Sequence, residues 1–113
     1  MSRQITIFKG DTEPLQFTIT DTAGAVNLTG QKVFFTVKKK VSDPDNYAII
    51  RKSWTSHTNA VGGITSYTLQ PSDTFKNPGT YFWEIQLKGS GGAISTSSTG
   101  EFIIQPHLTY TTT

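Results

Sequence analysis

The sequence contains no cysteine among its 113 residues. Disulfide bonds, thiolate metal sites, iron–sulfur clusters and cysteine nucleophiles are therefore excluded together. Small exported domains usually depend on disulfides, so we expect this domain to be stable through packing alone and to fold in a reducing cytosol. The first residues lack an apolar signal core and no hydrophobic run is as long as a membrane span, so we expect neither export by the general pathway nor contact with a membrane.

An excess of charge of one sign is also missing. Ten Lys and Arg residues against eight Asp and Glu residues give a formal net charge of +2. That balance is too small to indicate nucleic acid as a partner. The length is that of one domain, and the aromatic share of 12 % supplies large side chains for one core. We therefore expect a single domain over residues 1–113, with a short flexible tail at about 107–113.

Alternation of apolar and polar residues runs along most of the chain, and no stretch keeps a helical period. Gly, Pro, Asp and Asn separate the alternating segments at the spacing typical of a sandwich. This pattern predicts an all-β, immunoglobulin-like β-sandwich of about seven antiparallel strands, with a five- or six-stranded barrel as second choice. The expected strands cover 4–8, 15–20, 32–39, 47–54, 64–69, 81–88 and 93–105, with a kink at Gly100 and one helical turn at 70–74, capped by Ser72 or Asp73.

A motif before the strongest strand sharpens this prediction. The run from Asn77 to Tyr81 is typical of the tyrosine corner of immunoglobulin-like domains, in which Gly-x-Tyr opens a central strand and the phenol bonds the backbone upstream. Trp83 stands where an antibody domain has its second cysteine, so its side chain can fill the space of the missing disulfide. An ordinary turn before an aromatic strand is the alternative. We predict that Gly79, Tyr81 and Trp83 define the fold.

The sequence also resembles a known family over nearly its whole length, from Ile5 to Ile104. The resemblance is carried by turn and core residues in four pieces: Gly10-Asp11-Thr12 with 15–20; Asp21 to Gly24 with Val26, Leu28-Thr29-Gly30 and Val33-Phe34-Phe35; Gly63-Ile64 leading to Leu69; and Asp73-Thr74 with Pro78 to Tyr81. These pieces resemble the small immunoglobulin-like domains of tailed bacteriophages, similar to the N-terminal domain of the baseplate upper protein.

The resemblance implies a structural component of the virion that is assembled in the cytoplasm of the bacterial host. It also implies docking onto other phage virion proteins in repeated copies, as a homo-oligomer in a symmetric assembly. The expected function is therefore a protein–protein docking module of the tail or baseplate. A capsid decoration protein and a carbohydrate-binding module for the host surface are the alternatives.

Residues that would carry chemistry are sparse. His57 and His107 are the only histidines, and no cluster of His, Asp and Glu has the spacing of metal ligands. Glu84 and Glu101 can face each other across neighbouring strands, but a glycosidase places such a pair in a cleft that a domain this small rarely builds. The glycines at 89–92 lack the Lys-Ser/Thr and the helix of a phosphate loop. We therefore expect no catalytic centre, no metal and no cofactor.

Two aromatic residues are candidates for an interaction surface. If Phe35 and Trp83 point inward, strand alternation directs Phe34 and Phe82 outward. Exposed aromatic side chains favour an interface, although a covering loop would explain them equally well.

Basic residues provide the other candidate surface. Lys38, Lys39 and Lys40, with Arg51 and Lys52 on what is expected to be the adjacent strand, make up the one basic patch in the sequence. Such a patch can meet an acidic partner. Charged residues on an exposed strand also prevent sheet-to-sheet aggregation, and that role is the alternative.

Overall fold

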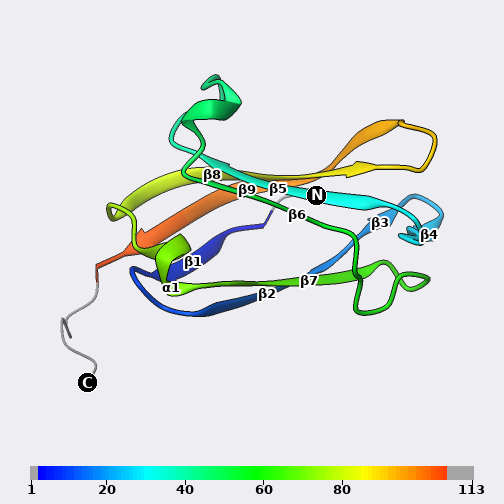
Figure 1. Ribbon diagram of the computed structural model, residues 1–113, viewed down its shortest axis with the longest axis horizontal. Coiled ribbons are helices and arrows are strands. Elements are labelled where there is room, and N and C mark those ends of the chain that lie inside the picture. The colour runs from blue at the N-terminus through cyan, green and yellow to red at the C-terminus, as the bar shows by residue number, and fades with distance from the viewer. Residues whose placement is uncertain (1–2, 107–113) are drawn as a thin grey trace.

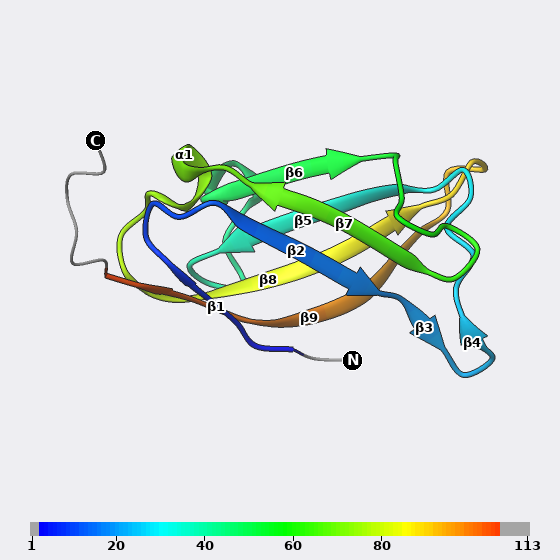
Figure 2. The ribbon, with the colours of Figure 1, turned by 90° about the horizontal axis from the view of Figure 1, so that it is seen from below.

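Two layers of β-strands make up the computed structural model, which describes residues 3–106 (Figure 1). One layer is a five-stranded sheet with the order β1-β9-β8-β5-β6, and the other is the β2–β7 pair, which lies across it (Figure 2). A short β3–β4 ribbon follows β2. The predicted all-β, immunoglobulin-like sandwich is confirmed. The strands are β1 Ile5–Phe8, β2 Glu13–Thr18, β3 Thr20–Asp21, β4 Gly24–Ala25, β5 Lys32–Lys38, β6 Ile50–Trp54, β7 Ile64–Leu69, β8 Gly79–Lys88 and β9 Ile94–Gln105.

The segment before β6 differs from the predicted strand 47–54. Asp45–Tyr47 forms a 3₁₀ turn, η1, and the strand begins only at Ile50. Pro44 starts this turn with its φ fixed near −68°, and its carbonyl accepts the Tyr47 N–H at 2.9 Å. The turn therefore uses backbone groups that a longer strand would have paired.

One strand pairing departs from the antiparallel arrangement expected throughout. β1 runs parallel to β9, with Ile5 opposite Phe102 and Ile7 opposite Ile104. The chain leaves the five-stranded sheet after β1 and enters the other layer at β2. β1 therefore forms no hairpin with the next strand and is able to pair in parallel with β9. The pairing joins the first and last described strands.

The expected kink at Gly100 is replaced by a bulge nearby. Ile85 pairs with Ser98 but Gln86 pairs with Thr96, so the unpaired residue of β9 is Ser97. Gly100 itself lies in regular register opposite Trp83. It is glycine because a Cβ there would lie 1.9 Å from the Arg3 carbonyl oxygen and 2.7 Å from the Trp83 indole nitrogen.

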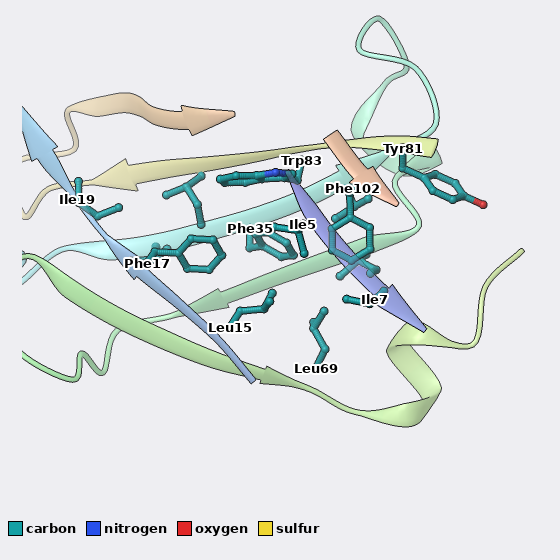
Figure 3. Close-up of a cluster of buried hydrophobic side chains, with 14 of the residues drawn as sticks. Ile5, Ile7, Leu15, Phe17, Ile19, Phe35, Leu69, Tyr81, Trp83 and Phe102 are labelled. Carbon is teal, nitrogen blue, oxygen red and sulfur yellow. The ribbon is translucent and has the colours of Figure 1, made fainter. Parts of the chain in front are cut away.

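Aromatic rings from both layers meet in the core (Figure 3). The ring of Phe17 on β2 lies 5.7 Å from that of Phe35 and 5.5 Å from that of Trp83, both on the five-stranded sheet. Tyr81 is buried with them, as the alternation predicted. The other buried apolar residues are Ile5, Ile7, Leu15, Ile19, Leu28, Val33, Val37, Ile50, Leu69, Ile85, Leu87, Phe102 and Ile104.

The start of β8 has the geometry of a tyrosine corner. The Tyr81 hydroxyl donates a hydrogen bond of 2.7 Å to the carbonyl of Asn77, four residues upstream. Burial raises the pKa of the Tyr81 phenol, which keeps it a donor. Two residues on, the Trp83 indole N–H donates to the Arg3 carbonyl at 2.7 Å and fastens the segment before β1 to the sheet. Gly79, Tyr81 and Trp83 remain our proposal for the residues that define the fold.

The predicted helical turn is present as α1, Pro71–Thr74, but its cap is Gln70 and not Ser72 or Asp73. Asp73 lies at the third helical position and accepts the Gln70 backbone N–H at 2.9 Å, which closes a capping box. Its other carboxylate oxygen lies 2.7 Å from the Lys52 ammonium on β6. One carboxylate therefore caps the turn and ties it to the five-stranded sheet.

This ion pair changes the pKa of both partners. Burial alone would raise the pKa of Asp73, but the hydrogen bonds from Lys52 and from the Gln70 N–H outweigh it and lower that pKa. The hydrogen bond to Asp73 raises the pKa of Lys52. The carboxylate is therefore held in its charged form more firmly than in the unfolded chain.

Replacing Gly100 by Ala should lower the free energy of unfolding by about 3 kcal/mol, since the new methyl group must displace the Arg3 carbonyl or the Trp83 indole. Gly91→Ala is the matched control, because no atom lies within 4 Å of the Cβ it would add, and its effect should stay within about 0.5 kcal/mol. Urea denaturation measures both. Equal stabilities for the two variants would contradict the close packing of β1 on β9.

Tyr81→Phe should cost about 1 kcal/mol of unfolding free energy, because it deletes the bond to the Asn77 carbonyl and keeps the buried ring. Tyr47→Phe serves as the control, since Tyr47 is 64 % exposed. Thermal denaturation of both variants tests the corner. A loss for Tyr81→Phe no larger than for Tyr47→Phe would show that the corner contributes nothing to stability.

Asp73→Asn should lower the unfolding free energy by about 1–2 kcal/mol at neutral pH through loss of the charged bond to Lys52. Because the folded pKa of Asp73 is depressed, this difference is present above the unfolded value, about 3.9, and is lost as the pH falls through the folded value. Urea midpoints at neutral and strongly acid pH, with exposed Asp11→Asn as control, measure it. A pH-independent difference would rule out the charge as the cause.

Candidate docking face

The side of the five-stranded sheet that points away from the β2–β7 layer is called here the outer face (Figure 1). Strand alternation places every second side chain of β5, β8 and β9 on it, opposite the core positions. Cross-strand register then fixes which of these side chains are neighbours: Phe34 with Gln86, Thr36 with Glu84, Lys38 with Phe82, Phe82 with Glu101, and Glu84 with Thr99.

A groove of about 570 Å³ lies on this face. Phe82 and polar side chains of β8 and β9 line it, and Arg3 and Gln4 lie at one side. The segment between β5 and β6 rises above the sheet and supplies Val41 and Asp45 to the lining (Figure 1). No signal in the sequence pointed to this hollow, because it depends on the conformation of that segment.

The two aromatic residues predicted to point outward differ in their surroundings. Phe82 is 37 % exposed and lines the groove. Phe34 is half-buried, with the Lys32 ammonium 5.3 Å from its ring centre. Their register partners on the neighbouring strands lie four positions apart, a spacing of about 13 Å. They therefore share a face without forming one aromatic patch, and a binding role for either stays a prediction.

Lys38 holds the segment that rises beside the groove. Its ammonium lies 2.8 Å from the Asp45 carboxylate and donates to the Asp43 carbonyl at 2.8 Å. The hydrogen bond and charge of Lys38 lower the pKa of Asp45. Lys38 therefore positions Asp45 and Val41 instead of presenting a free charge.

The other basic residues of the predicted patch point to different places. Lys39 lies over the ring of Tyr81, with its ammonium 5.0 Å from the ring centre. Lys52 is directed to Asp73 at the other side of the sheet. Lys40 is exposed, and its backbone N–H donates to the Asp43 carboxylate at 3.2 Å. The structure thus does not gather these cations into a single surface.

Two carboxylates that the sequence suggested only as an unlikely catalytic pair line the groove instead. Glu84 lies opposite Thr99, and Glu101 lies opposite Phe82, so they are diagonal neighbours on β8 and β9 and not directly opposed. The only polar contact of Glu84 within residues 3–106 is a weak hydrogen bond from the Thr96 hydroxyl at 3.4 Å. Both lie on the outer face, where they line the groove.

His57 belongs to a hydrogen-bond chain at the far edge of the sandwich. Its Nε2–H donates to the Gln31 carbonyl at 2.9 Å, and its Nδ1 shares a hydrogen bond of 3.0 Å with the Thr65 hydroxyl. That hydroxyl accepts from the Trp54 indole N–H at 2.6 Å. The histidine therefore has a structural role, and His107, like the tail expected at 107–113, lies outside the described residues.

Among residues 3–106, no group of three or more His, Cys, Asp and Glu side chains stands close enough to hold a metal ion. In the same part of the chain, no helix has the length and apolar character needed to cross a membrane.

Known proteins resemble this chain in fold, and a family model matches its sequence. The N-terminal domain of ORF48 of phage TP901-1 superposes with a TM-score of 0.63 at 14 % sequence identity, over 91 % of this chain and 85 % of that one. CopC from Methylosinus trichosporium OB3b gives a TM-score of 0.51 at 12 % identity, over 96 % of this chain and 89 % of that one. At these identities the likeness is one of fold. None of the curated proteins matches the sequence.

The family model of the BppU N-terminal domain matches residues 1–113, the whole of the sequence. This match agrees with the turn and core residues that suggested a phage domain, and it names the same part of the same baseplate protein. The chain therefore belongs to the family of the BppU N-terminal domain, the N-terminal domain of the baseplate upper protein, and is a structural domain of a phage tail or baseplate.

Proposed function

We propose that this domain is a docking module that binds another virion protein through the groove on its outer face. The observation that carries the proposal is the exposed ring of Phe82 in a groove of about 570 Å³, on a sheet whose other side is fully used by the core. Interfaces are built around aromatic side chains that stay partly exposed in the free protein. The domain acts by binding and not by catalysis.

The family supports a partner within the virion. A baseplate is built from repeated copies of its proteins, so a symmetric homo-oligomer with each copy presenting the same groove is the arrangement we propose. Assembly takes place in the cytoplasm of the bacterial host, in keeping with a core that needs no disulfide.

Neither alternative has an observation in its favour. A carbohydrate-binding face would need an aromatic platform, and Phe34 and Phe82 lie too far apart along the strands to form one. Capsid decoration would place the domain on the head, whereas the matching family is that of a baseplate protein.

The test is incorporation of a variant into phage particles. Phe82→Asp removes the exposed ring without touching the core, so the protein should fold but its amount in purified virions should fall at least tenfold, the size expected for a central interface aromatic. Val61→Asp, which changes another exposed apolar residue in a loop, is the control and should be incorporated normally. Quantitative mass spectrometry of the particles measures both.

Two outcomes would contradict the proposal in different ways. Normal incorporation of Phe82→Asp would show that the groove is not the docking surface. Absence of the unmodified protein from particles would show that this member of the family is not retained in the virion.

A further inference from the structure

The groove is acidic, although the chain as a whole carries a formal net charge of +2. Its lining includes two basic and three acidic residues: Arg3, Lys38, Asp45, Glu84 and Glu101. One of these basic residues is paired with one of the acidic residues, and the other basic side chain points elsewhere, so two carboxylates are left.

Lys38 is neutralised within the groove wall by Asp45, at 2.8 Å. Arg3 is turned away from the outer face. Its guanidinium donates to the Gln16 carbonyl on β2 at 2.7 Å and lies 5.3 Å from the ring centre of Phe17, both in the opposite layer. Neither cation therefore compensates the two glutamates.

Within residues 3–106, Glu84 and Glu101 take part in no ion pair. Arg51, another cation on this face, lies on β6 opposite Thr36. That position is two strands from Glu84, a separation of about 10 Å. Two carboxylates thus remain without a basic partner beside the exposed ring of Phe82.

The arrangement of these three side chains matches one kind of group. Glu101 lies directly across from Phe82, and Glu84 is two residues along the same strand, so all three point out of the same face. An aromatic ring attracts a cation placed over it, and carboxylates accept hydrogen bonds from the same cation. Arginine fits better than lysine, because its planar guanidinium stacks on a ring while its N–H groups reach carboxylates at its edge.

We infer that the groove binds an arginine side chain on an extended segment of a partner virion protein, with Phe82 beneath the guanidinium and Glu84 and Glu101 as its acceptors. The inference rests on the proposed docking function and adds the chemistry of the partner. The volume of about 570 Å³ suits a few side chains of a segment and not a folded surface. Gln86 and Thr99 offer polar groups to the backbone of that segment.

Titration of the isotope-labelled protein with a short peptide tests the inference directly. The probe is acetyl-Gly-Ser-Val-Arg-Val-Ser-Gly-amide, and its counterpart carries citrulline, which has the shape of arginine without the charge. The arginine peptide should shift the backbone amide resonances of Phe82, Glu84 and Glu101 in a saturable way. Its affinity should exceed that of the citrulline peptide roughly tenfold and should fall as salt is added.

The double variant Glu84→Gln/Glu101→Gln keeps the shape of the groove and removes its charge. It should bind the arginine peptide roughly tenfold more weakly, close to the level of the citrulline peptide. Glu13→Gln, on β2 in the other layer, is the matched control and should bind as the unmodified protein does. Equal binding of the two peptides, undiminished binding by the double variant, or shifts confined to other surfaces would each overturn the inference.

Particle incorporation separates this inference from the function on which it rests. A double variant that enters virions normally while Phe82→Asp does not would leave docking at the groove intact and reject arginine as the group recognised. If the double variant and Phe82→Asp are both lost from particles while Glu13→Gln is retained, the result supports docking at the groove and recognition of arginine together.

Discussion

The contact between Trp83, Arg3 and Gly100 holds the sandwich in its present form. The indole packs against Phe17 and Phe35 in the core, and its N–H satisfies the carbonyl of Arg3 at the edge of the sheet. The segment before β1 can approach this closely only because Gly100 has no side chain. In a chain without cysteine, this hydrogen-bonded aromatic side chain contacts both layers of the core and also helps to hold the segment before β1 against β9.

One side of the outer face depends on this arrangement. Arg3 and Gln4, which line the groove, directly precede β1, and they are held there by the pairing of β1 with β9 and by the bond from the Trp83 indole to the Arg3 carbonyl. The inward-pointing side chains of the sheet make up the core. Because side chains alternate along a strand, the outward-pointing ones do not pack in it. Outer residues can therefore be substituted with little loss of stability, and the same residues are the ones that a partner could contact.

Much of the fold followed from local patterns in the sequence, because strand alternation and turn residues are local properties. The alternation around Phe35 and Trp83 predicted which side of β5 and β8 faces the core, and the Gly-x-Tyr motif predicted the bond from Tyr81 to the backbone upstream. The parallel pairing of β1 and the bulge at Ser97 were not predicted, since each depends on which distant strand lies alongside.

The site was predicted only in part, for a related reason. Alternation was enough to direct Phe82 outward. The run of lysines suggested a basic surface, yet the fold uses Lys38 to hold the raised segment and directs Lys39 to the ring of Tyr81. The acidic character of the groove comes from Glu84 and Glu101, because Lys38 is paired with Asp45 and Arg3 points to the other layer, and no spacing in the sequence records such contacts.

The pairing of β1 with β9 has a consequence for synthesis on the ribosome. Ile5 meets Phe102, so the first strand must wait without its partner until almost the whole domain has been translated. Contacts between residues so far apart in the chain form late and slow folding. The final closure of the domain therefore waits for β9: the nascent chain can assemble β5, β6 and β8 first, but one edge of β8 stays open, and β1 has no partner, until β9 has left the exit tunnel.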